Sequence, residues 1–410
     1  MYRFLTPFLC LLSALLAGCL SAPPNVEAES GPIPELTTVH STGLFSGIVG
    51  FLALSEDGNT FIAGSGRSVG VYRTSDYAPL ERHYIREDEP STTVDDAGSS
   101  GTRASIYDLG YIDANTWYFS AMPFKENDVR VHVRTIHPPR EIFVSTVNEI
   151  TNEATASVNK NYIAYNNELI DWHTGKRYPV KTPAFDPYSL IVPTLTPDNR
   201  IITYPNEKTV IFDPLNDTMK FWKEALRIGR TIIVTPDNRH AIGISAANYR
   251  CTLWSWPERK EIGHCSEHLG WIFWGYFEYG ETVALSSDSK FFAVGVGHTV
   301  RVYRIEPFKL ELEVTTPGPV GKLALSDDGW LAAYDYKGFL RIWNVATGSL
   351  AGQRSFFDGK TIHGAYAPKL AFQPGSGGRL FTTYKNMTVF EAPKQTTQQK
   401  TESASGTQKE

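Results

Sequence analysis

The sequence predicts an all-β chain that consists of one small unit repeated along most of its length. Aromatic residues make up 12% of the 410 residues, and β-branched residues occur in short runs separated by turn residues. Both features are typical of many short strands joined by tight turns. The third observation is a pattern with a mean period of about 45 residues, the length of a four-stranded propeller blade. The predicted fold is therefore a single β-propeller.

The repeated unit is an apolar strand, a Ser/Thr-x-Asp-Gly/Asn type turn, a second apolar strand, a polar turn and a third strand that ends in an aromatic residue. The turn has a physical basis, because Asp hydrogen-bonds its own backbone and Gly or Asn tolerates positive φ. The clearest copy covers residues 323–350. The other copies cover residues 52–73, 109–136, 154–176, 194–213, 233–255, 284–304 and 370–391.

The number of turns predicts the number of blades. Turns between first and second strands lie near positions 57, 114, 160, 198, 237, 288, 328 and 375, so we expect eight blades, with seven as the alternative. The last copy lacks an outer strand after Phe390, and the strand-like segment Glu35–His40 has no partner before the first copy. Pairing these two segments would close the ring and remove exposed sheet edges. The propeller should then cover residues 35–392, followed by a disordered polar tail over 393–410.

The third strands resemble those of the WD-repeat family, most closely in Arg341–Ile342–Trp343–Asn344 followed by Ala346–Thr347–Gly348. The resemblance covers about 350 residues and implies four-stranded blades around a central channel. The Gly–His dipeptide of that family is missing from the expected places, and its closing Trp–Asp is replaced by pairs such as Tyr72–Arg73. The resemblance therefore predicts a fold and no particular function.

Residues 1–18 are predicted to be a signal peptide. A cationic start is followed by an apolar run from Phe4 to Leu16, which is too short to span a bilayer comfortably. The segment then ends in Leu16–Ala17–Gly18–Cys19, which resembles the lipobox of bacterial lipoproteins. The resemblance implies cleavage before Cys19 and acylation of that residue, palmitate included; an ordinary secretory signal is the alternative. Residues 19–34 are rich in Pro, Ser and Glu and should form a flexible tether.

The residue after the cysteine bears on where the protein is held. It is Leu20, whereas an Asp there favours inner-membrane retention in Gram-negative lipoproteins. The resemblance thus implies a lipid-anchored protein of the outer membrane. We expect it to face the periplasm, with exposure at the cell surface as the alternative. The net charge is −5 without a basic stripe, which argues against nucleic acid as a partner. The expected partners are the membrane, through the anchor, and another envelope protein.

The cysteines predict one disulfide. Cys10 lies in the signal peptide and Cys19 is assigned to the lipid, so Cys251 and Cys265 remain in a compartment that permits oxidation. If the hairpin between them centres on Glu258, the two cysteines face each other with Cα atoms roughly 4.5–5.5 Å apart. That separation suits a disulfide. Two buried free thiols are the alternative.

Two motifs match catalytic patterns only superficially. Residues 66–70 read G-x-S-x-G, but the Ser falls at a turn between strands instead of between a strand and a helix. Residues 264–268 read H-x-x-E-H, which needs a helix to place both His on one face, yet Gly263 and Gly270 flank it closely. The turn Asp residues are spread around the ring and so form no acid–base pair. We therefore expect no catalytic residues, no metal and no cofactor.

The aromatic stretch between the fifth and sixth blades is the leading candidate for partner binding, since Trp and Tyr are favoured at interface hot spots. Its candidate residues are Trp271, Phe273, Trp274, Tyr276, Phe277 and Tyr279. At least two of these rings should be exposed if they bind a partner; packing between blades is the alternative. The acidic insert His83–Arg103 is a second candidate, with a solvated loop as its alternative.

The sequence thus predicts a non-catalytic interaction platform for another envelope protein. The architecture is similar to that of the propeller lipoprotein in the outer-membrane β-barrel assembly machinery, which is analogy at the level of the fold. A propeller enzyme or a glycan-binding protein that uses the central funnel is the alternative.

Replacing Cys19 by Ala should leave an unprocessed or soluble protein, because no thiol remains to receive the acyl chains. Membrane fractionation and the mass of the mature chain measure this outcome. Cys10→Ala is the matched control and should be processed normally. Normal processing and membrane attachment of the Cys19→Ala variant would contradict the lipobox assignment.

Overall fold

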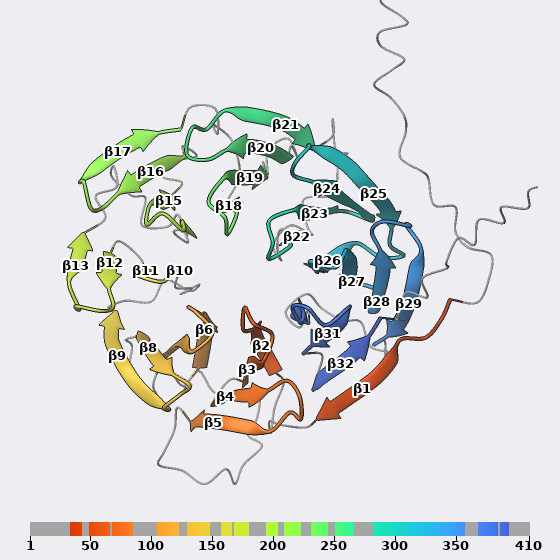
Figure 1. Cartoon of the computed structure of the whole chain (residues 1–410), viewed down its shortest axis with the longest axis horizontal. Coiled ribbons are helices and arrows are strands. Elements are labelled where there is room, and N and C mark those ends of the chain that lie inside the picture. Colours follow the sequence, from red (N-terminus) through yellow and green to blue (C-terminus); the bar gives the residue numbers. More distant parts are fainter. Residues whose placement is uncertain are drawn as a thin grey trace, which may run out of the picture.

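The computed structural model describes fourteen segments of the chain: residues 33–42, 49–65, 68–84, 105–122, 129–147, 157–165, 168–179, 194–203, 209–222, 231–244, 251–265, 282–356, 368–383 and 386–392. They form eight separate four-stranded antiparallel sheets arranged in a ring (Figure 1). The predicted all-β propeller with eight blades is confirmed, and the seven-blade alternative is wrong. The predicted signal peptide and tail lie outside the described residues, as does nearly all of the predicted tether.

Each of the first seven blades takes four consecutive strands, ordered from the channel to the rim. Blades 1 and 2 consist of β2 (Val49–Leu54), β3 (Thr60–Ser65), β4 (Ser68–Arg73), β5 (Pro79–Tyr84), β6 (Ser105–Tyr111), β7 (Thr116–Met122), β8 (Val129–Thr135) and β9 (Arg140–Val147). Blades 3 and 4 consist of β10 (Ser157–Val158), β11 (Tyr162–Tyr165), β12 (Glu168–Asp171), β13 (Arg177–Pro179), β14 (Thr194–Leu195), β15 (Ile201–Thr203), β16 (Val210–Asp213) and β17 (Thr218–Phe221).

The second half of the ring follows the same order until its last blade. Blades 5 and 6 consist of β18 (Thr231–Val234), β19 (His240–Ile244), β20 (Cys251–Ser255), β21 (Glu261–Cys265), β22 (Thr282–Leu285), β23 (Phe291–Val296), β24 (Thr299–Arg304) and β25 (Lys309–Thr315). Blades 7 and 8 consist of β26 (Val320–Leu325), β27 (Trp330–Asp335), β28 (Phe339–Asn344), β29 (Leu350–Ser355), β30 (Leu370–Phe372), β31 (Arg379–Thr382), β32 (Met387–Glu391) and β1 (Thr37–Thr42).

Ring closure joins the two ends of the described chain. Strand β1 pairs antiparallel with β32, so that Thr38 lies opposite Phe390. The predicted pairing is confirmed, with one correction at its start. Glu35 forms a parallel bridge to Gln353 of blade 7, because the chain reaches blade 8 by running along the neighbouring rim strand. Leu36 is buried there, so this approach also completes the core of blade 7.

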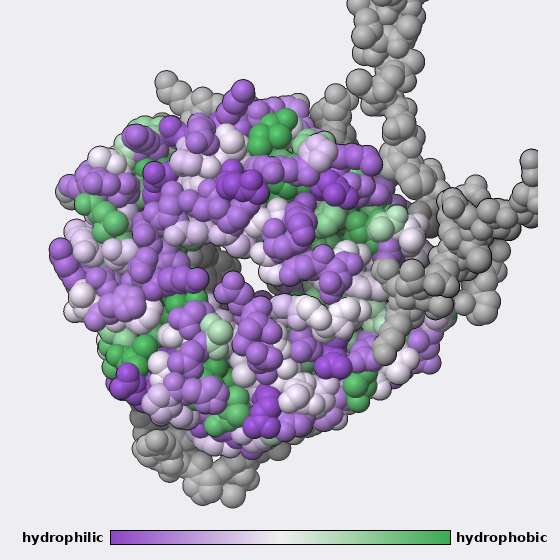
Figure 2. All heavy atoms as spheres, viewed as in Figure 1, coloured by the Kyte–Doolittle hydropathy of each residue, from purple (hydrophilic) through white to green (hydrophobic). Residues whose placement is uncertain are grey.

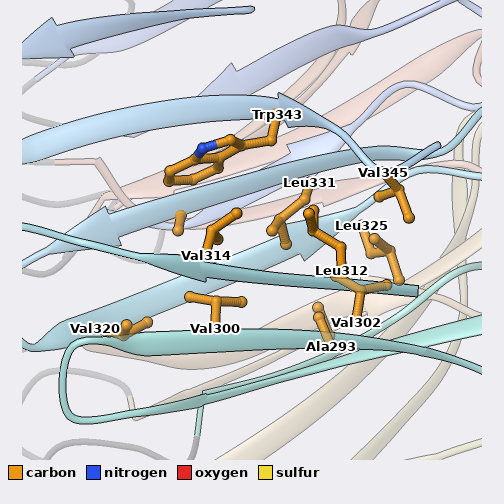
Figure 3. Close-up of a cluster of buried hydrophobic side chains, with 12 residues drawn as sticks. Ala293, Val300, Val302, Leu312, Val314, Val320, Leu325, Leu331, Trp343 and Val345 are labelled. Atoms are coloured by element: carbon orange, nitrogen blue, oxygen red, sulfur yellow. The ribbon is translucent and has the colours of Figure 1, made fainter. Parts of the chain in front are cut away.

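The core lies between the blades, because each sheet has a neighbour on both faces. In β27 every residue is buried: Leu331 and Ala333 face blade 6, whereas Ala332 and Tyr334 face blade 8. Figure 3 shows the cluster between blades 6 and 7, where Val302 and Leu331 pack together with other apolar side chains. A strand that is buried on both faces reads as a continuous apolar run, as the second strands of the repeats do.

The turns between first and second strands use the chemistry that the repeat predicts. In blade 1, Ser55 Oγ donates to Asp57 at 2.6 Å, Asp57 accepts from the Asn59 amide at 3.0 Å, and Gly58 takes φ +69°. Partial burial alone would raise the pKa of Asp57, but these hydrogen bonds outweigh it and lower that pKa. The carboxylate is thus held ionised as a structural part of the turn.

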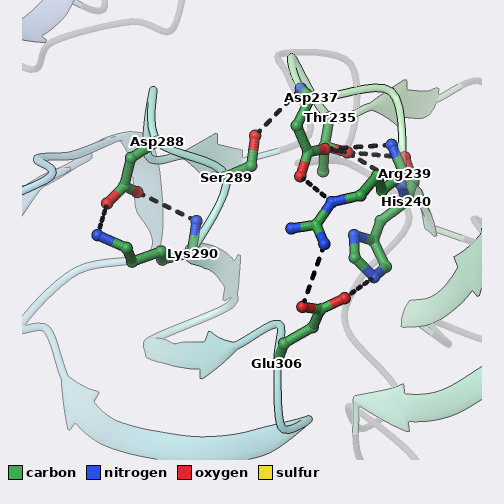
Figure 4. A network of polar contacts seen from close by, with 8 residues as sticks. All are labelled: Thr235, Asp237, Arg239, His240, Asp288, Ser289, Lys290 and Glu306. Atoms are coloured by element: carbon green, nitrogen blue, oxygen red, sulfur yellow. Dashed lines mark hydrogen bonds and ion pairs between the residues drawn. The ribbon is translucent and has the colours of Figure 1, made fainter.

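Polar contacts connect every pair of neighbouring blades. Figure 4 shows the seam between blades 5 and 6, where Glu306 accepts from His240 Nε2 at 3.1 Å and the Asp237 amide donates to Ser289 at 3.4 Å. The remaining seams are crossed by hydrogen bonds between Tyr111 and Thr60, Arg177 and Ser145, Asn159 and Thr196, Trp256 and Asp198, Ser287 and Asp327, Gly377 and Asp328, and Gln373 and Gly58. The ring is therefore fixed by polar contacts as well as by its apolar core.

The predicted disulfide between Cys251 and Cys265 is present in blade 5. The two residues lie directly opposite each other on β20 and β21, with Cα atoms 4.9 Å apart. The predicted register, centred on residue 258, holds from Cys251 to Leu253. Beyond it, between Leu253 and Trp254, the pairing shifts by one residue. Both cysteines are buried against side chains of blade 6.

Removing this disulfide should lower the free energy of unfolding by about 3 kcal/mol, the chain-entropy value for a closed loop of about fifteen residues. The measurement compares urea unfolding of the wild type with that of the Cys251→Ala, Cys265→Ala double variant. Dithiothreitol should destabilise the wild type and leave the double variant unchanged. Equal stability of the two proteins without reductant would contradict a stabilising bridge.

Candidate functional site

The innermost strands surround a central opening. Strands β2, β6, β10, β14, β18, β22, β26 and β30 form this inner circle (Figure 1), and hydrophilic residues line much of the opening in the space-filling view (Figure 2). Side chains on these strands come from all eight blades, although they are far apart in the sequence. The channel can therefore bring together side chains from different repeats into one site.

An equivalent position on the inner strands is occupied by a charged residue in blades 2, 7 and 8. In each blade, one backbone amide donates a hydrogen bond across the turn between the first and second strands; Ser55, Ile112 and Ser326 are examples. The position lies four residues before the residue that carries this amide. Because the repeats are pseudo-symmetric, these positions lie at one level of the channel. In the described residues they are Phe51, Asp108, Thr231, Thr282, Lys322 and Lys369.

Asp108, Lys322 and Lys369, here called the channel cluster, belong to blades 2, 7 and 8. Only Phe51 of blade 1 stands between Lys369 and Asp108 around the ring. In two of these blades the strand register shifts just before the charged residue. The shift lies between Ile106 and Asp108 in β6, and between Val320 and Lys322 in β26. The channel cluster therefore occupies one side of the channel.

Asp108 is paired with a buried phenol. Tyr118 Oη donates a hydrogen bond to Asp108 Oδ2 at 2.9 Å. Burial raises the pKa of Asp108 to about 6, although the Tyr118 hydrogen bond, the Leu109 amide and the charge of Lys369 each oppose that rise. Burial also raises the pKa of Tyr118, so the phenol stays protonated. This carboxyl group therefore changes its charge close to neutral pH.

The two lysines contribute positive charge at the same level. Lys322 is half-buried on β26, and burial, followed by the charge of Lys369, lowers the pKa of Lys322. Among the described residues, no carboxylate lies within 4.0 Å of either ammonium group. Asp108 and Lys369 interact electrostatically, without direct contact between the carboxylate and the ammonium group. The positive charge of Lys322 is thus uncompensated within this part of the chain.

The rim carries a separate feature, an apolar patch on blade 4. Within the described segments, the exposed large apolar side chains lie on outermost strands or in turns that lead into them; they are Val39, Tyr84, Ile142, Val144, Leu215, Met219, Phe221 and Ile262. Leu215, Met219 and Phe221, here called the rim patch, are 49%, 41% and 51% exposed. Met219 and Phe221 alternate along β17, so they share one face of that strand.

The strand pairing shows which neighbouring blade the rim patch lies beside. Met219 lies opposite Phe212, whose side chain packs against Leu169 of blade 3. Met219 and Phe221 therefore lie on the face of β17 that is turned toward blade 3. Both side chains remain about half exposed in the ring.

The predicted site residues fall partly outside the described chain. Cys19 and the aromatic stretch from Trp271 to Tyr279 lie outside it, and so does nearly all of the acidic insert; these assignments stay predictions. Ser68 opens strand β4, with its Oγ 3.1 Å from that of Ser65. His264 lies on β21 and contacts Glu261 at 2.7 Å. Within the described segments, no group of three or more His, Cys, Asp or Glu residues is placed to hold a metal, and no helix is long and apolar enough to cross a membrane.

The sequence comparison of the repeats missed the channel cluster by one residue. Its copies begin at Leu52, Leu109, Leu323 and Leu370, and the residues immediately before them are Phe51, Asp108, Lys322 and Lys369. A charged residue directly before an apolar first strand is the signal that could have found the cluster. The rim patch had no such signal, because apolar residues on a strand are ordinarily expected to be buried.

Comparisons with known proteins identify the fold. No protein-family model matches the chain, and no curated protein matches its sequence. Among solved structures, the computationally designed Ika8 protein is similar, with a TM-score of 0.56 and 14% sequence identity. The match covers 87% of this chain and 99% of Ika8. At this identity the similarity shows a shared fold alone.

Asp108→Asn should make the protein more stable at pH 7.5 than the wild type, and the difference should vanish near pH 4. The pKa of Asp108 is about 6 in the folded chain and about 3.9 when unfolded, so the wild type loses stability as the pH rises through this window. This pKa difference is worth at most about 3 kcal/mol. Unfolding midpoints measured between pH 4 and pH 8 test the claim.

Tyr118→Phe is the companion variant for this measurement. It removes the hydrogen bond that favours the Asp108 carboxylate, so the loss of stability should extend to higher pH than in the wild type. An Asp108→Asn difference that is the same at pH 4 and pH 7.5 would contradict the raised pKa of Asp108.

Proposed function

We propose that this protein is a lipid-anchored, non-catalytic platform that binds another protein of the bacterial envelope through the rim patch. The observation that carries the proposal is the exposure of Met219 and Phe221 on the outermost strand of blade 4 and of Leu215 in the turn before it. Strand β17 pairs with β16 on one side, and no other strand of the described segments pairs with its outer edge. Exposed apolar side chains beside a free strand edge favour binding of another chain.

The position of the ring's entry point supports the anchoring part of the proposal. Residues 33–36 run along β29 and lead into β1, so the chain enters the propeller at the rim of blades 7 and 8. Blade 4 lies across the ring from blade 8 (Figure 1). A lipid on Cys19 would therefore tether the ring from its blade 7 and 8 side, and the rim patch lies on the opposite side of the ring from that attachment.

The disulfide supports an extracytoplasmic location. Disulfides persist in oxidising compartments such as the periplasm and are rare in the cytosol. The Cys251–Cys265 bridge lies between two strands of a blade and is buried, so it is part of the folded scaffold. This agrees with the signal peptide and lipobox that the first nineteen residues resemble.

Ligand binding in the central channel is the second candidate function. The channel cluster favours it, because Asp108 titrates close to neutral pH and Lys322 carries a charge without a partner among the described residues. This candidate needs no enzyme activity, and it is compatible with a partner at the rim.

A photo-crosslinking residue at Met219, introduced into living cells, should capture one defined envelope protein. The same residue at Val144 of blade 2, another exposed apolar rim position, is the matched control and should not capture it. Adding Leu215→Ser and Phe221→Ser should abolish the crosslink, while the melting temperature stays close to that of the wild type because both side chains are half exposed. Equal capture from Met219 and Val144, or a crosslink that survives the double substitution, would contradict the rim patch as the binding surface.

A further inference from the structure

The channel holds a positive charge that the described part of the chain does not neutralise. Lys322 projects from the innermost strand of blade 7 and is half-buried, yet none of the described carboxylates is within ion-pair distance of it. Charged groups that are withdrawn from water are normally paired with an opposite charge. A second ammonium, that of Lys369, is near enough to disfavour the charge on Lys322 further.

The backbone fixes both lysines in place. The Val320 amide, at the start of β26, donates to the Gly297 carbonyl at 2.6 Å. The Lys369 amide donates to Thr383 Oγ1 at 3.0 Å, next to the start of β30. Strands β26 and β30 are adjacent inner strands of blades 7 and 8. The two side chains thus start from fixed points at one level of the channel.

The remaining charge of the channel cluster does not cancel this pair. Asp108 lies beyond blade 1 from Lys369, and its carboxyl group already accepts a hydrogen bond from Tyr118. When Asp108 is ionised, its negative charge and the two lysine charges give the channel cluster a net charge of one positive unit. When it is protonated, the net charge of the cluster is two.

We propose that the channel binds a phosphate group beside the inner strands of blades 7 and 8, held by the ammonium groups of Lys322 and Lys369. A phosphate group carries up to two negative charges, which matches two ammoniums, and each ammonium offers three hydrogen-bond donors to its oxygens. The ligand is thus a small phosphate-bearing solute or free phosphate. This site rests on the channel and not on the rim patch, so either proposal can fail without the other.

The test measures binding of inorganic phosphate and of a sugar phosphate to the purified full propeller by calorimetry, at constant ionic strength. The wild type should bind at least one of them, and Lys322→Met should weaken that binding at least tenfold. Lys322→Met removes a half-buried charge, so this variant should fold. Lys220→Met, which removes an exposed lysine on the rim, is the matched control and should bind like the wild type.

A third variant tests the sign of the electrostatics. Asp108→Asn removes the nearby negative charge and should tighten phosphate binding several-fold at pH 7.5. Tighter binding of the sugar phosphate than of inorganic phosphate would identify a solute ligand, and the reverse would identify the free anion. Absence of phosphate binding by the wild type, equal affinity of the wild type and Lys322→Met, or equal binding of acetate would overturn the proposal.

Discussion

The structure depends on one constraint: every blade must bury both of its faces, and only a closed ring gives every blade two neighbours. The middle strands show the result, since alternate residues of β27 pack into the cores on either side. Closure itself rests on β1, which supplies the outer strand of blade 8. Residues 347 positions apart in the sequence, Ser41 and Thr388, lie together on this pair of strands.

Most of the fold follows from local chemistry that recurs in the sequence. Each Ser/Thr-x-Asp turn could be recognised separately, and counting the turns gave the correct number of blades. The unpaired segment before the first copy also identified its partner, because the last copy lacked one strand. The Cys251–Cys265 pairing could be predicted because a hairpin register follows from the length of its turn.

The features that sequence reasoning could not supply depend on neighbours that are distant along the chain. Asp108 and Lys322 belong to blades on the same side of the ring, and no local pattern brings them together. Phe221 lies on the face of β17 turned toward blade 3 and is 51% exposed, which the sequence of its own repeat does not predict. Glu35 pairs with Gln353 because the rim strand of blade 7 lies along the path to blade 8. The local sequence pattern therefore predicts the structure of the repeated unit. The candidate sites are formed by residues that differ from one repeat to the next.

The closing strand also sets the order in which this protein can mature. Because β1 is the first and β32 the last of the described strands, β1 has no partner in its blade until residues 387–391 have been made. Blades 1 to 7 can form as their own four strands appear, whereas blade 8 needs strands from both ends of the described chain. Domains generally fold as units during synthesis, and unpaired strand edges are prone to aggregate. A chain that stops before β32 would thus display a free strand that a chaperone or protease can recognise, so closure of the ring distinguishes chains that contain residues 387–391 from shorter ones.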